Sequence, residues 1–350
     1  MTSANKKKNL KKLPYNRLAV ESGNAAYREM RLQVQKVGIL DRQYPYYAIL
    51  ALFILAGFFF SLYQVYITKE VIRLILWSML FGFFSVQISG FVHDSGHRGI
   101  FNSTKLNDIA GHISGALLAT DFGSWKYRHN LHHAHTNEEE LDPDLIEMPF
   151  LSFAKSKFQA KKGFWRKASN YQVFFYYPLM LLYNFGLRLY GIEYYAQHFK
   201  REDLREVIVF VVTVFIWFIL PFFIFPIGKG ILVFTVVNLT MSMYLMNVIA
   251  PNHKAMPKFA KAMKLSFLDH QILTSSNVYG NLVYDFFYMG LNYQIEHHLF
   301  PNCPRNKLYK IAPYVREVCR KRRLEYTERG FIQSNKYILA ELKHIAETSK

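Results

Sequence analysis

Seven of the chain's 13 histidines lie in three short clusters whose spacing is typical of metal ligands. Side chains three or four residues apart share one face of a helix, so each cluster can direct two or three of them toward one metal ion. Neutral imidazole is a strong ligand for iron, zinc and copper. One such cluster is a weak signal, but three of them and a further histidine predict a pair of metal ions. The clusters are His93-Asp-Ser-Gly-His97, His129-Asn-Leu-His132-His133 and Gln294-Ile-Glu-His297-His298.

Long apolar segments must deliver these clusters to one place. Four segments are long and apolar enough to cross a bilayer, at about 46–67, 71–92, 206–226 and 230–250. A short turn joins the first two, and a turn bounded by Pro226 and Gly230 joins the last two. Each pair is therefore predicted to form a helical hairpin that returns the chain to the side from which it came. All three histidine clusters then face the same side of the membrane.

These patterns predict an all-α integral membrane protein with four transmembrane helices in two hairpins. Residues 1–44 are predicted to form a polar arm with an amphipathic helix, and residues 45–350 the membrane domain. Segments 93–205 and 251–350 are predicted to make a helical cytoplasmic cap that carries the metal site. Lys and Arg lie mainly before, between and after the hairpins, so the positive-inside rule places the active site and both termini in the cytoplasm.

Two segments leave alternatives open. The spacing of apolar residues over 27–40 predicts an amphipathic helix, which lies on the membrane or packs against the protein's own aqueous part. Segment 173–190 is nearly long enough to span, but Pro178 and Arg188 weaken it. We expect a helix in the interface or against the protein, because another span would put the last histidine cluster on the opposite face.

Composition argues against several other classes of protein. Cys303 and Cys319 are the only cysteines, which excludes a cysteine-ligated iron–sulfur cluster within the chain and argues against a disulfide framework. The HExxH motif of zinc hydrolases is absent, and the predicted spans lack the central charges expected of a transporter. The formal net charge of +18 indicates anionic lipid head groups and cytoplasmic loops rather than nucleic acid, because the apolar segments are long. The basic, polar N-terminus predicts no signal peptide.

The motifs closely resemble those of the membrane fatty-acid desaturase family. HDSGH, HNLHH and QIEHH look like the family's three histidine boxes, and the resemblance extends over about residues 45–320. Gln294, at the start of the third box, is similar to front-end desaturases and their bacterial acyl-lipid relatives rather than to stearoyl-type enzymes. The flanking residues are also similar, in Ser124-Trp125, in the HTN run at 135–137, in Asp142-Pro-Asp144 and in the PNH run at 251–253.

The resemblance implies an O2-dependent oxidoreductase that introduces a cis double bond into a lipid- or CoA-linked acyl chain at a di-iron centre. A di-iron lipid or carotenoid hydroxylase or ketolase is the close alternative, because it needs the same metal site. Gln294 stands where related enzymes place a histidine, so we expect it to ligate weakly or through water. No catalytic side chain is expected beyond the metal ligands. The ligands that the resemblance implies are His93, His97, His129, His132, His133, His253, His297 and His298.

Polar residues beside the boxes are candidates to accept ring N–H bonds and so to orient the ligands. The chain lacks the HPGG haem motif of the cytochrome b5 domain that many front-end desaturases carry, so we expect electrons from a separate ferredoxin or cytochrome b5. The basic cytoplasmic surface either attracts such a carrier or only sets the membrane orientation. The orienting candidates are Asp94, Asn137, Asp142, Asp144, Asp285 and Glu296. The histidines expected to be structural are His112, His135, His198, His270 and His344.

Overall fold

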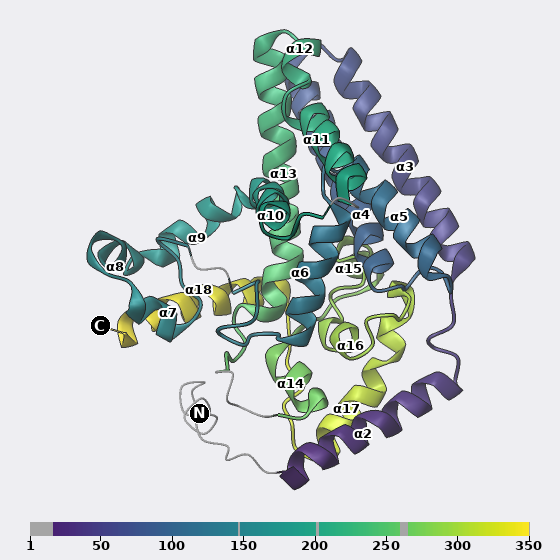
Figure 1. Cartoon of the computed structure of the whole chain (residues 1–350), viewed down its shortest axis with the longest axis vertical. Helices are drawn as coiled ribbons and strands as arrows, with labels where there is room; N and C mark the ends of the chain where they lie inside the picture. Colours follow the sequence, from purple (N-terminus) through teal and green to yellow (C-terminus); the bar gives the residue numbers. More distant parts are fainter. Residues whose placement is uncertain (1–16, 146–147, 201–202, 260–264, 350) are drawn as a thin grey trace.

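The computed structural model describes residues 17–145, 148–200, 203–259 and 265–349, which are mostly helical (Figure 1). The first helices are α2 (Arg17–Lys36), α3 (Tyr44–Ile67), α4 (Val71–Gly96), α5 (Thr104–Leu117), α6 (Phe122–Ala134), α7 (Lys155–Ala160) and α8 (Gly163–Ser169). They are followed by α9 (Gln172–Met180), α10 (Tyr183–His198), α11 (Leu204–Phe218), α12 (Pro221–Ile224) and α13 (Ile227–His253). The last are α14 (Phe267–Thr274), α15 (Leu282–Phe287), α16 (Gln294–Leu299), the 3-10 helix η3 (Arg305–Lys310), α17 (Ala312–Arg322) and α18 (Phe331–Thr348). Strands β1 (Asn277–Val278) and β2 (Glu328–Arg329) pair in parallel.

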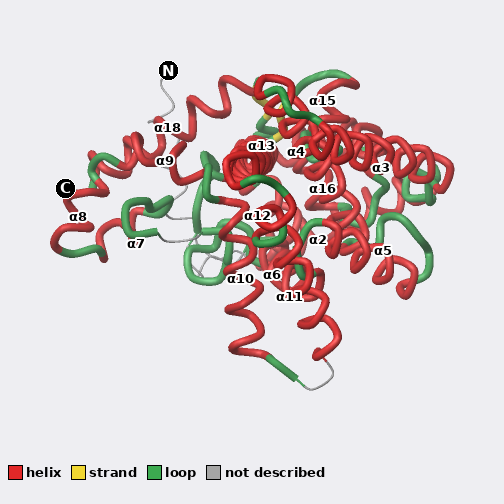
Figure 2. Tube along the Cα trace, turned by 90° about the horizontal axis from the view of Figure 1, so that it is seen from above, coloured by secondary structure: helices red, strands yellow, loops and turns green. Residues whose placement is uncertain are grey.

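Three long apolar helices, α3, α4 and α13, form the upper part of the molecule in Figure 1. They contain 24, 26 and 27 residues, more than the roughly 20 that a membrane-spanning helix needs. Helix α4 packs between α3 and α13 (Figure 2). Apolar side chains such as Leu52 and Ile72 are 73% and 69% exposed. These helices are therefore long and apolar enough to cross a membrane, and they coincide with three of the four predicted spans.

The predicted third span, at about 206–226, is not one continuous helix. Helix α11 ends at Phe218 after 15 residues, and the four-residue α12 begins at Pro221. Pro221 has no backbone N–H, so it cannot donate the bond to the Trp217 carbonyl that would continue α11. The described residues therefore contain three candidate spanning helices, and the predicted third span consists of two shorter helices, because proline outweighs the apolar composition there.

The turn before α13 lies beside the turn between α3 and α4. Lys229, in the first turn of α13, donates from Nζ to the backbone carbonyls of Tyr66 and Thr68, at 2.8 Å each. Glu70 caps α4 by accepting the backbone N–H groups of Ile72 and Arg73, which are among the donors that a helix start leaves unpaired. The upper ends of the three long helices are thereby held together, and their other ends reach the same region.

Segment 173–190 contains all of α9 except its first residue and the first half of α10, and the two helices are separated at Leu181 and Leu182. Gln172, at the start of α9, donates to the Leu342 carbonyl of α18 at 2.7 Å. In α10, Asn184 is fully buried and donates to the side chain of Asn238 in α13 at 2.8 Å. The segment therefore packs against the protein, in agreement with one of the two placements expected from the sequence.

The amphipathic helix near the N-terminus is longer than expected, because α2 begins at Arg17 rather than near residue 27. Its buried Met30 and Val34 belong to an apolar cluster with residues of α14, α16 and α17, among them Leu268 and Val315. Helix α2 therefore packs on the protein's own lower part, which was one of the two alternatives. Residues 1–16 of the predicted polar arm lie outside the described residues.

Candidate metal centre

The last turn of α4 carries the first histidine pair. His93 lies within the helix and His97 caps it, donating its backbone N–H to the His93 carbonyl at 3.2 Å. Arg98 follows with a φ of 58°, a left-handed conformation that ends the helix. Both rings therefore remain at the lower end of a long apolar helix.

Helix α6 carries the second cluster, and α16 the third. Asp121 caps α6 by accepting the backbone N–H of Ser124 at 2.6 Å, which fixes where the helix starts. All six residues of α16 are buried, including Gln294. His253 is the last residue of α13. Four elements that are distant in sequence, α4, α6, α13 and α16, thus meet near the lower ends of the long helices (Figure 1).

Five rings form a first group, with their Nε2 atoms turned toward one another. Nε2 of His93 lies 3.1 Å from Nε2 of His297, and Nε2 of His97 lies 2.8 Å from that of His129. Nε2 of His133 lies 3.1 Å from that of His297 and 3.2 Å from that of His129. Nitrogens that share one metal ion through bonds of about 2.1 Å lie about 3 Å apart. The first group therefore has the spacing of a ligand set.

A second group consists of His132, His253 and His298, whose ligand atoms lie within 4.8 Å of one another. All three rings are buried, and Nε2 of His298 has no hydrogen-bond partner. Gln294 Nε2 lies 2.9 Å from Nε2 of His253, so this side chain is beside the second group. The rings of His298 and His133 stack with 4.1 Å between their centroids, which places the two groups side by side.

Each of the two three-residue clusters divides between the groups. In α6, His129 and His133 face the first group and His132 faces the second; in α16, His297 faces the first and His298 the second. Consecutive helical residues point about 100° apart, so a pair of adjacent histidines supplies one ring to each group. For these two clusters, the expectation that all the rings of one cluster face a single metal was therefore wrong, whereas His93 and His97 of the first cluster lie in the same group, and the division favours two metal positions.

Asp142 orients His132 from the loop after α6. Its Oδ1 lies 2.9 Å from Nδ1 of His132, and its Oδ2 accepts the backbone N–H of Asn137 at 2.7 Å. Asn137 has a φ of 57°, and its side chain donates to the His253 carbonyl at 3.1 Å. A carboxylate that accepts from Nδ1 leaves the lone pair on Nε2 free for a metal. Asp142 and Asn137 thus lie where they can hold the second group.

The other two rings of the second group have partners that the sequence did not suggest. Nδ1 of His298 lies 2.8 Å from Oε1 of Gln271, in α14, and Nδ1 of His253 lies 3.1 Å from the Thr274 carbonyl. Both contacts leave Nε2 of the ring turned toward the group. Gln271 stands outside the histidine boxes, so spacing along the chain carries no signal for its role.

Asp94 connects His93 to a buried ion pair. Its Oδ1 lies 3.1 Å from Nδ1 of His93, and its Oδ2 accepts from Nε of Arg305 and from the hydroxyl of Tyr47, at 2.6 Å each. The Asp94 and Arg305 side chains are 7% and 4% exposed, respectively. Gly90 leaves room for the guanidinium, because a Cβ there would lie 2.5 Å from Nη2 of Arg305. Arg305 and Tyr47, from η3 and α3, are further orienting residues that sequence reasoning missed.

Burial favours the neutral form of most of these rings. Desolvation, and then repulsion between neighbouring imidazoles, holds the pKa well below its ordinary value for His97, His129, His133, His297 and His298. Neutral imidazole is the form that binds a metal. For His132, burial alone would lower the pKa, but the carboxylates of Asp142 and Asp144 outweigh it and raise the pKa.

Two of the candidate orienting carboxylates contact no imidazole in the hydrogen bonds of the described residues. Glu296 is fully buried, but its oxygens accept from the side chains of Asn277 and Tyr326, at 2.8 Å each. Burial raises the pKa of Glu296. Asp285 accepts from the side chain of Asn292 at 2.8 Å. Glu296 lies two residues after Gln294, on the far side of a short helix, and this explains why the expectation was wrong.

Four of the five histidines expected to be structural make side-chain contacts outside both groups. Nε2 of His112 lies 3.5 Å from a Glu206 oxygen, and Nδ1 of His198 lies 3.1 Å from the Tyr194 carbonyl. The remaining contacts are His135 with Glu138 at 3.3 Å and His270 with the Thr136 carbonyl at 2.7 Å.

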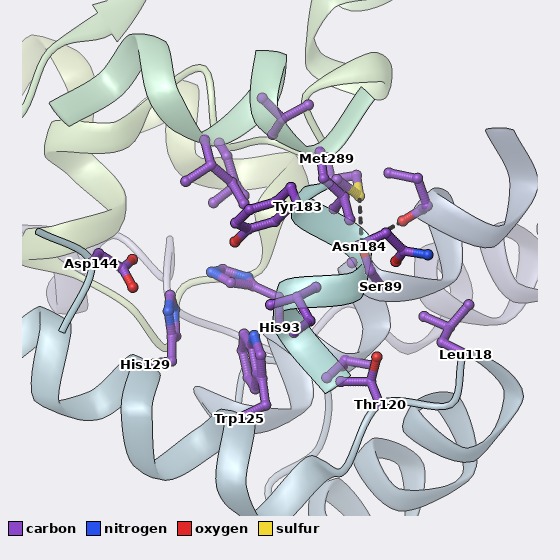
Figure 3. A pocket seen from close by; sticks show the side chains of 18 of the residues that line it. Ser89, His93, Leu118, Thr120, Trp125, His129, Asp144, Tyr183, Asn184 and Met289 are labelled. Carbon is purple, nitrogen blue, oxygen red and sulfur yellow. Dashed lines mark hydrogen bonds between the residues drawn. The ribbon is translucent and has the colours of Figure 1, made fainter. Parts of the chain in front are cut away.

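A cavity with mostly apolar walls adjoins the histidines (Figure 3). It lies between α4, α6, α10 and α13, and its apolar lining includes Val86, Leu187, Met241 and Leu245. In Figure 3, His129 and Asp144 lie toward one side, and Leu118, Thr120 and Asn184 toward the other. Trp125 also lines the cavity and stacks on His129, with 4.6 Å between the ring centroids.

The side chains at the centre fit metal ions. Imidazole nitrogens supply the inward-facing donors of both groups, and this ligand type suits iron, zinc, copper and nickel. Nε2 of His298 is buried, has no hydrogen-bond partner and faces neighbouring ring nitrogens. A buried acceptor without a partner costs free energy unless something binds it. Long helices that are apolar enough to cross a membrane thus end at a histidine-lined centre suited to metal ions, beside an apolar cavity, and this combination is typical of a membrane metalloprotein.

Comparison with known proteins identifies the family within this class. Residues 70–330 match the family described as fatty acid desaturase, and the chain belongs to it. The protein is therefore an oxidoreductase of lipid metabolism, as the resemblance implied.

The individual proteins to which the chain is similar are also named as desaturases. The chain is 27% identical over 337 residues to an acyl-lipid (9-3)-desaturase of Borago officinalis, covering 91% of this chain and 74% of that protein. It is 28% identical over 338 residues to delta(8)-fatty-acid desaturase 1 of Arabidopsis thaliana, with 91% and 74% covered. It is 25% identical over 323 residues to the delta(5) fatty acid desaturase fat-4 of Caenorhabditis elegans, with 87% and 70% covered.

Proposed function

We propose that the two histidine groups hold two iron ions and that the protein uses O2 to introduce a cis double bond into an acyl chain lying in the cavity. The observation that carries the proposal is the position of the cavity, whose lining includes His93, His129, His132 and His253 together with aliphatic side chains. Relatives named as acyl-lipid and fatty-acid desaturases support the substrate class.

The first group would hold one ion, and the second group the other. Iron bound there would supply the oxidant that removes hydrogen from an unactivated methylene, which has no acidic proton. The protein's own residues orient the rings through Asp94, Asp142 and Gln271, while the apolar walls exclude water and hold the chain beside the centre. Gln294, next to His253, fits a weak ligand or one that acts through water.

Electrons would come from a separate ferredoxin or cytochrome b5. Removal of two hydrogens with reduction of O2 to water would require two further electrons from outside, because the chain's two cysteines are too few to hold an iron–sulfur cluster. The chain's excess of Lys and Arg over Asp and Glu, 43 against 25, favours an acidic carrier, because complementary charge accelerates encounter.

Product analysis tests the proposed reaction. We expect a host that expresses the chain to accumulate a fatty acid lighter by two hydrogens than its precursor, and a host that expresses His132→Ala not to do so. Gas chromatography with mass spectrometry of the total lipids, after derivatisation to locate the double bond, gives the answer. A product that has gained oxygen instead would favour the hydroxylase or ketolase alternative, which uses the same metal site.

We also propose that α11 and α12 together make a broken fourth crossing, so that both hairpin turns face away from the cytoplasm. The contacts of Lys229 with Tyr66 and Thr68 support this, because they place the two turns at one end of the molecule. Both termini and the histidine groups would then lie on the cytoplasmic side.

Cysteine labelling tests this topology. We expect Lys69→Cys and Gly228→Cys to react with an impermeant maleimide added outside intact cells, and Lys321→Cys to react only after permeabilisation. Gly228 tolerates the change, since a Cβ there meets nothing within 4 Å. The natural Cys303 and Cys319 are buried and serve as the background. Labelling of Lys321→Cys from outside would refute the arrangement.

A further inference from the structure

The cavity contains a buried cation that the metal centre does not account for. Arg188, in α10, lines the cavity and is 5% exposed. Among the residues that the structure describes, no carboxylate lies within ion-pair distance of its guanidinium, and no neighbouring charge affects its pKa, which burial alone lowers to about 9. The group is therefore charged at neutral pH in a mostly apolar surrounding.

Neighbouring carbonyl oxygens accept hydrogen bonds from this guanidinium, but one of its nitrogens has no partner. Nη1 donates to the backbone carbonyl of Asn184 at 2.7 Å and also to its side-chain oxygen, and Nη2 donates to the Leu118 carbonyl. The Phe218 ring centroid lies 5.6 Å from the guanidinium carbon. A guanidinium has five N–H donors, and Nε, although buried, has no partner. The side chain is thus held in place, and its Nε–H group remains without an acceptor.

Its position relative to the histidines gives the cavity a direction. Arg188 binds Asn184 and Leu118, which Figure 3 shows on the side of the cavity away from His129 and Asp144. Much of the remaining lining, which includes Leu187 and Met241, is apolar. An acyl substrate has the same polarity, with one polar head and a long hydrocarbon chain.

We propose that Arg188, positioned by Asn184, binds the anionic oxygen group at the head of the acyl substrate, either the phosphate of a lipid- or CoA-linked chain or the carboxylate of a free fatty acid. Arginine suits both groups because its planar fork matches their oxygens and can donate two parallel bonds. A buried charge without a counter-ion is costly, and an anionic head group would remove this cost when substrate binds. This inference rests on the proposed function and adds the direction of the chain, whose head lies at Arg188 and whose methylenes lie beside His93.

Arg188 would then also influence which carbons are oxidised. A head group fixed at one end of the cavity sets the number of methylenes between it and the histidines. The position of the new double bond would therefore be counted from the head of the chain, because small displacements of reacting groups cost large factors in rate.

Binding measurements on the full-length, iron-loaded protein test the proposal. The probes are oleate, 1-oleoyl-lysophosphatidate and methyl oleate, which share one chain and differ in whether the head is a carboxylate, a phosphate or uncharged. We expect at least one anionic probe to bind the wild type about 10-fold to 100-fold more tightly than the methyl ester, the range for hydrogen bonds to a charged group. Arg188→Met is expected to lose this preference, and Arg188→Lys to keep part of it.

Arg166→Met is the matched control. Arg166 also donates to backbone carbonyls, those of Phe158 and Ser349, and packs over the Phe158 ring, but it does not line the cavity. The control should keep the preference for the anionic probe. The comparison between oleate and lysophosphatidate shows whether the recognised oxygens belong to a carboxylate or a phosphate.

Two results would overturn the proposal. One is a wild type that binds methyl oleate as tightly as both anionic probes, a result that needs no variant to fold. The other is a folded Arg188→Met protein that keeps the wild-type preference, in which case Arg188 only caps the end of α5. Binding is measured without an electron donor, so it does not depend on turnover. Iron content and product lipids of the same preparations report separately on the proposed function.

Discussion

His298→Ala is expected to abolish double-bond formation and to remove iron from the second histidine group, while the protein still inserts into the membrane. Nε2 of this ring is buried, unpartnered and turned toward the other two rings of the group. Loss of a residue that orients a metal ligand already costs about 10-fold to 100-fold in affinity or activity, so loss of the ligand should cost more. Iron per protein, measured by mass spectrometry after iron-replete expression, should fall by about half, since only one group is broken.

His270→Ala provides the control for this experiment. His270 lies close by in α14, but its Nε2 contacts the Thr136 carbonyl at 2.7 Å and belongs to neither group. The control should keep its iron and a large part of its activity. If His298→Ala binds as much iron as His270→Ala, the second group is not a metal site.

The identity of the histidines at this centre was predictable from the sequence, but their division into two groups was not. The resemblance gave all eight histidines that the structure brings together, because the boxes are local motifs. Helical spacing alone was misleading about their grouping, since His132 and His133 are adjacent in sequence and belong to different groups. Which ring faces which metal depends on how α6 and α16 are rotated about their axes, and packing decides that rotation.

The residues that orient the ligands were harder to predict. Asp142 could be proposed because it follows the second box closely, whereas Gln271 and Arg305 reach their partners from 27 and 211 residues away in sequence. No local pattern marks such contacts. Glu296 shows the opposite error, since a carboxylate beside two ligands was expected to serve them and instead bonds to Tyr326 and Asn277.

The fold was predictable where composition alone decides it. Helices α3, α4 and α13 coincide with three predicted spans, because long apolar segments have few alternatives to a helix in a membrane. At 206–226, apolar composition did not reveal that Pro221 divides the segment into two helices, although this proline is visible in the sequence. The packing of α2 on α14 and α17 depends on long-range contacts that periodicity cannot distinguish from packing on lipid.

Arg305→Leu is expected to have the second-largest effect, which acts on stability and on the first group together. The substitution leaves the Asp94 carboxylate buried without its cation, and breaking a buried pair in this way costs about 3–5 kcal/mol. The Asp94 carboxylate also lies 3.1 Å from Nδ1 of His93. Without the Arg305 guanidinium, Asp94 loses a contact that holds it beside this ring. We therefore expect a lower melting temperature and an iron affinity reduced about 10-fold to 100-fold.

A double variant separates the two effects. In Asp94→Asn with Arg305→Leu, both charges are gone, so stability should recover in part. The iron affinity should stay low, because an amide is a weaker acceptor for His93 than a carboxylate. Thermal unfolding and iron titration of the single and double variants measure the two quantities independently.

Arg322→Leu is the matched control, since it breaks another largely buried pair, and neither of its residues hydrogen-bonds to a ring of the first group in the described part of the chain. Arg322 donates to both oxygens of Asp269, at 3.0 and 2.8 Å, and joins α17 to α14. Its loss should lower the melting temperature without changing the iron affinity of the first group. If Arg305→Leu also keeps wild-type iron affinity, Asp94 does not position His93 for metal binding, and the ion pair serves only to fasten η3 to the end of α4. The reason for expecting otherwise is that Asp94 contacts both His93 and the guanidinium, so a change at one partner is expected to reach the other.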